Sequence, residues 1–476
     1  MGQEISDTGF SPDDYAAFRQ HMREETQTLK HWFDTRAFDW SEQATVGLEL
    51  EAWLIDRDHL PAPQNAAFLS ALDHPDIVSE LSRFNFEINA PARPLQQHVL
   101  TQTAADLADR WAACEATGQT LGLRPLAIGI LPTVRDEMLQ LSWMSDANRY
   151  RALNEAILSR RKDHDLHISI EGEDTLDYHC NHIMLEAACT SLQAHLKVNQ
   201  EEAARLYNAA VVAAAPLIAA TANAPYLYGK SLWTETRIPA FEQATRLEGF
   251  RDTEGRNVGR VTLGTGYVRH SMMELFLRNL SYEPILPALN ADTATLPHLR
   301  LQNGTIWRWV RPILGFDSDQ TPHLRLEHRV MPAGPSLTDT VANLALCHGL
   351  VLGLGRLETP PEDETRFEDA RYNFYACAQH GLKAQIRWAG RSVNVQALLL
   401  DELLPLARQA LEAEGLGQIE LDDAFTHTLQ PRLRSGLTGA EWQRSFIDCN
   451  GYNFQALTER YAEMQATGDP VHSWTV

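Results

Sequence analysis

The sequence is poor in cysteine and contains no long apolar stretch. It has six cysteines in 476 residues and no C-x-x-C pair, so neither a disulfide scaffold nor a cysteine-rich zinc fold is expected. We expect reduced, mostly buried thiols and a cytoplasmic protein. The N-terminus has no basic segment followed by an apolar one, which predicts that there is no secretory signal.

Basic residues are also scarce. Acidic residues outnumber them by 63 to 41, and the formal net charge is -22, which argues against nucleic acid as a partner because such a protein needs a basic stripe. The most apolar run, residues 211–222, is too short to span a bilayer and contains Pro216, so we expect no membrane partner. An acidic protein can still bind ATP if metal ions and arginines reverse the charge locally.

Two short motifs are too weak to assign a function. Residues 224–231 fit the loosest form of the phosphate-binding P-loop, but Pro225 lacks the backbone N–H that such a loop needs, and bulky side chains fill it. Gly2 followed by Ser6 matches only a loose myristoylation pattern. Neither motif predicts a nucleotide site or a lipid anchor.

Four histidines form two H-x-x-H pairs close to Cys180. They are His164, His167, His179 and His182. Such residue types would allow a zinc site. Their spacing fits neither the H-E-x-x-H motif nor a standard zinc finger, so histidines of the surface or the core are the favoured interpretation.

Residues 45–56 alternate between apolar side chains and others. This period of two predicts a strand with one face packed on a core. Glu49 and Glu51 then point to the opposite face, roughly 7 Å apart at ~3.3 Å per residue. A cation beside them would relieve their repulsion, and carboxylate oxygens suit Mg²⁺ or Mn²⁺. Taken alone, the pattern favours the solvated outer face of an antiparallel sheet over a metal site.

Three later stretches repeat the combination of an apolar face and a polar face that carries ligands. The polar faces bear, in chain order, Glu87; Gln193 and His195; and Arg325, Glu327 and Arg329. Ordinary solvated faces are richer in Lys, Thr and Ser. A sheet that brings these faces together would gather acids, an imidazole, an amide and arginines in one cleft.

The four stretches resemble, in order and spacing, the motif series of the glutamate–cysteine ligase superfamily. The segments that carry the likeness are residues 47–51, 86–89, 190–195 and 326–329. They are most similar to the second branch, the bacterial and plant-like carboxylate–amine ligases. The resemblance implies an α+β, glutamine synthetase-like fold, with a curved antiparallel sheet and outer helices. It also implies ATP-dependent joining of an amino acid carboxylate, such as glutamate, to an amine through an acyl phosphate.

The resemblance also implies roles for individual residues. The ligands for Mg²⁺ or Mn²⁺ would be Glu49, Glu51, Glu87, Gln193, His195 and Glu327. Arg329 and Glu327 would be catalytic, because a guanidinium beside a metal-binding carboxylate suits phosphoryl transfer. Arg149, Arg260 and Arg311 would bind the small-molecule substrates. Two alternatives stay open, namely a two-metal hydrolase that uses the same groups and a catalytically inactive regulatory relative.

We expect one catalytic domain over residues 1–476. Its core with the motifs spans about 45–355, and a C-terminal helical part spans about 356–476. Helix starts are predicted at Ser11-Pro12 and at Ser336. Residues 223–270 are expected to form active-site loops because they contain few periodic runs. The sequence leaves open whether the protein forms a homo-oligomer.

Overall fold

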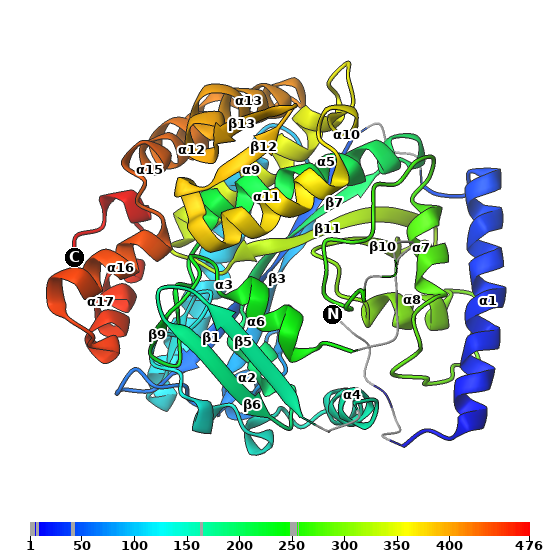
Figure 1. Ribbon diagram of the computed structural model, residues 1–476, viewed down its shortest axis with the longest axis horizontal. Coiled ribbons are helices and arrows are strands. Elements are labelled where there is room, and N and C mark those ends of the chain that lie inside the picture. The colour runs from blue at the N-terminus through cyan, green and yellow to red at the C-terminus, as the bar shows by residue number, and fades with distance from the viewer. Residues whose placement is uncertain (1–4, 6–8, 40–42, 162–164, 248–254, 256) are drawn as a thin grey trace.

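The centre of the molecule is a curved antiparallel sheet of seven strands (Figure 1). The computed structural model describes residues 5, 9–39, 43–161, 165–247, 255 and 257–476. The strand order is β10-β11-β7-β1-β3-β2, and β4 pairs with the end of β1. The bounds are β1 Thr45–Ile55, β2 Ile77–Ser79, β3 Asn85–Pro94, β4 Arg124–Leu126, β7 Ser191–Val198, β10 Val310–Phe316 and β11 Pro322–Pro332. The sheet with outer helices confirms the predicted architecture.

Apolar side chains alternate along β1 as predicted. Val46, Leu48 and Leu50 are buried in the larger hydrophobic cluster, which also contains residues of helices α3 (Val99–Leu121), α5 (Gln200–Thr221) and α9 (Leu337–Gly355). The apolar run at 211–222 therefore belongs to a longer helix than expected, with Pro216 inside it. By length and composition α5 and α9 could each cross a membrane, but 89% of each apolar window is buried inside the protein. They are therefore core helices.

The other face of the sheet is partly covered by short elements. These are α4 (Asn148–Ser159), the hairpin β5–β6 (Leu166–Glu171 and Thr175–Cys180), the 3-10 helix η3 (Met184–Ala188) and α6 (Arg237–Ala244). The predicted loop region 223–270 thus contains α6. It also contains the hairpin β8–β9 (Tyr226–Leu227 and Lys230–Ser231). The stretch that loosely fits a P-loop forms this hairpin.

The apolar residues 126–130 predict a buried strand ended by Pro132, but only the first of them forms part of a strand. Residues 126–130 are buried, but regular pairing ends at Leu126. The backbone N–H of Thr190 donates to the Gly129 carbonyl at 3.0 Å, and its hydroxyl donates to the Ile128 carbonyl. Gln465 accepts from the Ala127 N–H at 3.0 Å, and Tyr461 and Gln465 donate to the Ala127 carbonyl. Thr190 and these two side chains thus satisfy the segment in place of a strand ladder.

The C-terminal part is helical, as expected, except for one small hairpin. Its elements are α10 Pro361–Glu364, α11 Phe367–His380, β12 Gln385–Trp388, β13 Arg391–Asn394, α12 Val395–Leu398, α13 Leu404–Ala413, α14 Gln418–Leu421, α15 Gln430–Ser435, α16 Gly439–Asn450 and α17 Phe454–Ala466. Leu399, Leu403 and Leu411 extend the larger hydrophobic cluster. A buried ion pair of 2.6 Å joins Arg432 to Asp339 of α9. The C-terminal part and the sheet therefore share a core.

The remaining helices lie outside the sheet. They are α1 Pro12–Thr35, α2 Asn65–Leu72, α7 Met273–Asn279 and α8 Pro297–Gly304. The predicted helix starts are confirmed. Ser11 and Ser336 each accept a hydrogen bond from the third residue of their helix in a capping box.

Candidate active site

The register of the sheet brings the predicted ligands onto one face. Glu51 lies opposite Glu87, Glu49 opposite Gln193, and Glu327 opposite His195. Residues that lie directly opposite each other in an antiparallel pair point to the same face. The six side chains therefore form a row across β3, β1, β7 and β11, on the face turned away from α5 and α9. We call this set, together with Glu80, the acid row.

Three carboxylates crowd together at one end of the acid row. Glu51, Glu80 and Glu87 each offer an oxygen atom, and these atoms lie within 4.8 Å of one another. Neighbouring groups orient two of them. The backbone N–H of Ser191 and the amide of Gln193 donate to Glu51 at 2.7 and 3.1 Å, and Asn89 donates to Glu87 at 2.9 Å.

Burial and mutual repulsion raise the pKa values at this end. Burial and the charge of Glu80 raise the pKa of Glu51 to about 7. Burial and the charges of Glu49 and Glu80 raise the pKa of Glu87 well above its usual range. Burial also raises the pKa of Glu80, although Arg149 partly offsets it. Only protons or cations can neutralise such a cluster.

The side chains of Gln193 and His195 complete a donor set for a metal. Within the described chain, the buried Oε1 of Gln193 accepts no hydrogen bond. The Nε2 of His195 lies 3.2 Å from Glu49. An unsatisfied amide oxygen among carboxylates and an imidazole fits a divalent cation with oxygen and nitrogen ligands. The residues present therefore suit the Mg²⁺ or Mn²⁺ that the sequence implied.

Two arginines lie at the opposite end of the row, on β10 and β11. Arg311 binds Glu327 through two nitrogens, with shortest distances of 2.9 and 2.6 Å, and Arg329 binds it at 2.7 Å. Burial alone would raise the pKa of Glu327, but the two guanidinium groups lower it to about 2. Burial likewise opposes ionisation of Glu49, but His195 and Arg329 hold its pKa well below the usual range. This end is ionised and carries the positive charge of the site.

Comparison with known proteins places the chain in a family. The family described as glutamate–cysteine ligase family 2 matches residues 45–466. The chain belongs to glutamate–cysteine ligase family 2. A search among curated proteins found no match. The family span includes the C-terminal helices, so the match extends beyond the segments from which the sequence suggested it.

Two solved structures support the same fold. Glutamate–cysteine ligase from Francisella tularensis, in complex with AMP, has 11% identity and a TM-score of 0.53, with 90% of each chain covered. A bifunctional glutathione synthetase from Pasteurella multocida has 13% identity and a TM-score of 0.51, covering 90% of this chain and 53% of the other. At such identities the likeness establishes the glutamine synthetase-like fold alone, and family membership identifies the chain as a ligase.

The predicted substrate arginines of this family member are placed differently from one another. Arg311 lies at the arginine end of the acid row, bonded to Glu327. At the other end, burial raises the pKa of Glu80, and the charge of Arg149 partly offsets this rise. Arg260 is buried elsewhere. It donates to the Thr305 carbonyl at 3.0 Å and to the Glu283 carbonyl, so backbone groups already use its donors. Its substrate role remains a prediction that these contacts do not favour.

Sequence reasoning missed two carboxylates of the site. Glu80 directly follows β2 and lies outside the alternating residues that revealed Glu87. The sequence feature that came nearest to predicting Glu80 was its position seven residues before Glu87. Glu186 lies on η3, and burial together with the charges of Glu80 and Glu51 raises its pKa to about 8. No periodicity marks a single residue on a 3-10 helix.

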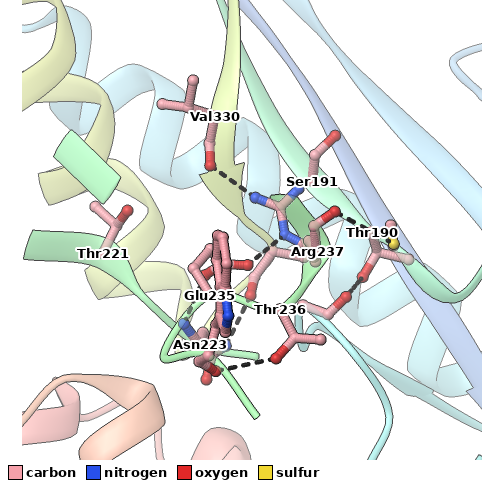
Figure 2. A network of polar contacts seen from close by, with 12 residues as sticks. Thr190, Ser191, Thr221, Asn223, Glu235, Thr236, Arg237 and Val330 are labelled. Atoms are coloured by element: carbon pink, nitrogen blue, oxygen red, sulfur yellow. Dashed lines mark hydrogen bonds and ion pairs between the residues drawn. The ribbon is translucent and has the colours of Figure 1, made fainter. Parts of the chain in front are cut away.

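A buried polar network beside the row holds strand β11 (Figure 2). Arg237 donates to Glu235 at 2.8 Å and to the carbonyl of Val330, the residue after Arg329, at 2.7 Å. Glu235 also accepts from the backbone N–H of Asn223 at 3.0 Å. The ion pair thus fixes the part of β11 that carries Arg329.

Proposed function

We propose that the protein is an ATP-dependent carboxylate–amine ligase that forms an amide through an acyl phosphate. The observation that carries this proposal is the acid row, with three crowded carboxylates at one end and two arginines at the other. Phosphoryl transfer is catalysed mainly by positioning and charge neutralisation. A site that joins a metal-binding end to a guanidinium end is suited to that task.

Glu49, Glu51, Glu80, Glu87, Gln193 and His195 would hold Mg²⁺ or Mn²⁺. When bound, such ions neutralise the phosphate oxygens of ATP. The backbone N–H of Ser191 keeps Glu51 oriented, and Asn89 does the same for Glu87. These bonds hold the carboxylates in place before a ligand arrives, which lowers the cost of binding.

Arg329 and Arg311 would bind the transferring phosphoryl group. Glu327 now accepts hydrogen bonds from both, and two guanidinium groups against one carboxylate leave a net positive charge. Glu327 would hold them at the correct spacing, besides any contact with a metal ion. The planar fork of arginine matches phosphate oxygens, which a lysine cannot do.

The reaction has two steps. A carboxylate oxygen of the acid substrate attacks the terminal phosphorus of ATP, and ADP leaves. The nitrogen of the amine then attacks the acyl carbon, inorganic phosphate leaves, and the amine loses a proton. The AMP bound in the Francisella tularensis enzyme supports the assignment of an adenine nucleotide as co-substrate.

All six cysteines are free, which supports a cytoplasmic location.

The proposal is tested by a screen for ADP release. The full chain is incubated with ATP and Mg²⁺ over pairs of amino acids and amines, and products are identified by mass spectrometry. We expect ADP, phosphate and an amide in equal amounts, and no turnover in EDTA. Metal-dependent hydrolysis without ATP would instead establish the two-metal hydrolase and reject the ligase.

A further inference from the structure

The hairpin β5–β6 brings together two of the histidines of the H-x-x-H pairs. His167 and His179 occupy opposite positions in its register. Their rings are stacked, with centroids 4.3 Å apart and planes at 7°. Both side chains are more than half exposed. His182 is buried, and His164 lies outside the described residues.

A carboxylate lies beside the Nε2 atoms of both rings. Oδ1 of Asp177 is 2.7 Å from Nε2 of His167 and 3.7 Å from Nε2 of His179. One ligand atom from each of the three residues lies within 4.8 Å of the others. Zinc bonds of about 2 Å place tetrahedral ligand atoms roughly 3.3 Å apart. Because the rings are nearly parallel, both imidazoles would turn toward Asp177 to bind one ion, and their exposed side chains leave room for this rotation.

A second carboxylate prepares one of the histidines for metal binding. Oδ2 of Asp165 lies 2.7 Å from Nδ1 of His179. A proton on Nδ1 that bonds to Asp165 leaves the lone pair of Nε2 free, and that nitrogen is the one beside Asp177. Histidines that bind metals commonly donate their other N–H to a carboxylate in this way.

We propose that His167, Asp177 and His179 form a binding site for Zn²⁺, outside the acid row. Asp165 is a positioning residue for this site, and water fills the fourth position. Imidazole ligands favour zinc over Mg²⁺, which prefers oxygen ligands. The site is therefore chemically distinct from the acid row, and the proposal does not depend on the ligase reaction.

The position of the site indicates what zinc does there. Near its turn the hairpin is already held, because Asp174 accepts from the Ser231 backbone N–H at 2.8 Å. Further along β5, Ser169 exchanges two hydrogen bonds with Gln243. The open end, at residues 165–167 and 177–180, leads through η3 into β7. Zinc would fasten this end and so stabilise the native state by mass action.

The test is calorimetric titration of the full, untagged chain with Zn²⁺ alone. The titration is carried out in excess Mg²⁺, so that zinc does not occupy the acid row. We expect one equivalent of Zn²⁺ to bind, and the melting temperature to rise with zinc. His167→Ala and His179→Ala should each abolish both effects. Asp165→Asn should weaken the affinity by about 10- to 100-fold.

His427→Ala is the matched control. His427 is an exposed histidine beside a carboxylate, with Asp423 at 3.3 Å, and its loss should leave zinc binding unchanged. Circular dichroism checks that every variant is folded. If the parent binds no zinc, or if the double variant His167→Ala/His179→Ala binds it as tightly as the parent, the proposal is wrong. A loss of affinity in His427→Ala as large as in His179→Ala would equally overturn it.

Discussion

The carboxylates of the acid row differ in charge because their neighbours differ. Glu327 lies beside two guanidinium groups, and His195 and Arg329 lower the pKa of Glu49, so both carboxylates stay ionised. Glu51 and Glu87 are beside other acids, so burial and repulsion raise their pKa values. A single strand face thus contains both kinds of carboxylate. Identity and alternation in the sequence reveal the face, whereas the charge of each residue depends on partners from other strands.

Replacing Glu87 with Gln should weaken metal binding without weakening the fold. An amide of the same shape imitates the protonated carboxyl and relieves repulsion from Glu51 and Glu80. We expect the melting temperature of the metal-free variant to equal or exceed that of the parent, while calorimetry shows at least a tenfold loss of affinity for Mg-ATP. A large drop in melting temperature would show that Glu87 is structural.

Replacing Arg329 with Lys should affect the rate more than the affinity. Lysine keeps the charge but loses the planar fork. Loss of one such donor typically costs ~3–4 kcal/mol, or roughly a hundred- to thousandfold in kcat, with little change in the KM for ATP. Steady-state kinetics at several Mg²⁺ concentrations measures kcat and the KM for ATP of each variant and of the parent. Extra Mg²⁺ should partly rescue Glu87→Gln and should not rescue Arg329→Lys, so equal rescue would contradict the assignment.

At the scale of elements, the strands that carry ligands were predictable because each alternates with a period of two and pairs in register. The contributions of Glu80, Glu186 and Arg237 were not. They come from the residue after β2, from η3 and from α6, where no period shows which way a side chain points. Their positions depend on tertiary packing, which a local pattern does not encode. For the same reason, the sequence predicted a substrate-binding role for Arg260 as well as for Arg311, although the structure places Arg260 away from the acid row.

The Glu235–Arg237 pair lies at the start of α6, and Arg237 also binds the Val330 carbonyl of β11. This contact gives a prediction at the scale of elements. Arg237→Met should leave Glu235 and the Val330 carbonyl buried without their partner, which typically costs about 3–5 kcal/mol. The double variant Glu235→Gln/Arg237→Met should recover part of this loss. Urea unfolding of both variants and the parent measures the difference. A single variant as stable as the parent would show that the pair does not hold the end of β11.

At the scale of the whole molecule, the metal-free protein should lose stability as pH rises from about 6.5 to 8. The pKa values of Glu51 and Glu186 are about 7 and about 8 in the folded chain, above the ordinary value of 4.5. In this window the folded state retains protons that the unfolded state has released, so the free energy of unfolding falls, at ~1.4 kcal/mol per proton and pH unit. Below about pH 6.5 the low pKa values of His328 and His348, about 4 and about 3, act in the opposite sense, and below about pH 5 the low pKa of Glu327 does too.

Thermal unfolding across this pH range, with EDTA present, measures the slope. Saturating Mg²⁺ should reduce the slope of stability against pH, because metal ions replace the protons on the carboxylates of the acid row. The double variant Glu51→Gln/Glu186→Gln should have a flatter profile than the parent. A parent profile that rises with pH over this window would show that the acids of the row are not protonated in the folded state.

The order of the strands also has a consequence for synthesis on the ribosome. Strand β1 lies between β3 and β7 in the sheet, but the Ser191 N–H that binds Glu51 lies 140 residues further along the chain. At ~5–20 residues per second, roughly 7–28 s pass before β7 emerges. Until then residues 45–50 of β1 are unpaired on one edge, in a nascent chain that already contains β3 and β4. Chaperone capacity and translation speed should therefore govern the yield of soluble protein more strongly than the stability of the finished fold does.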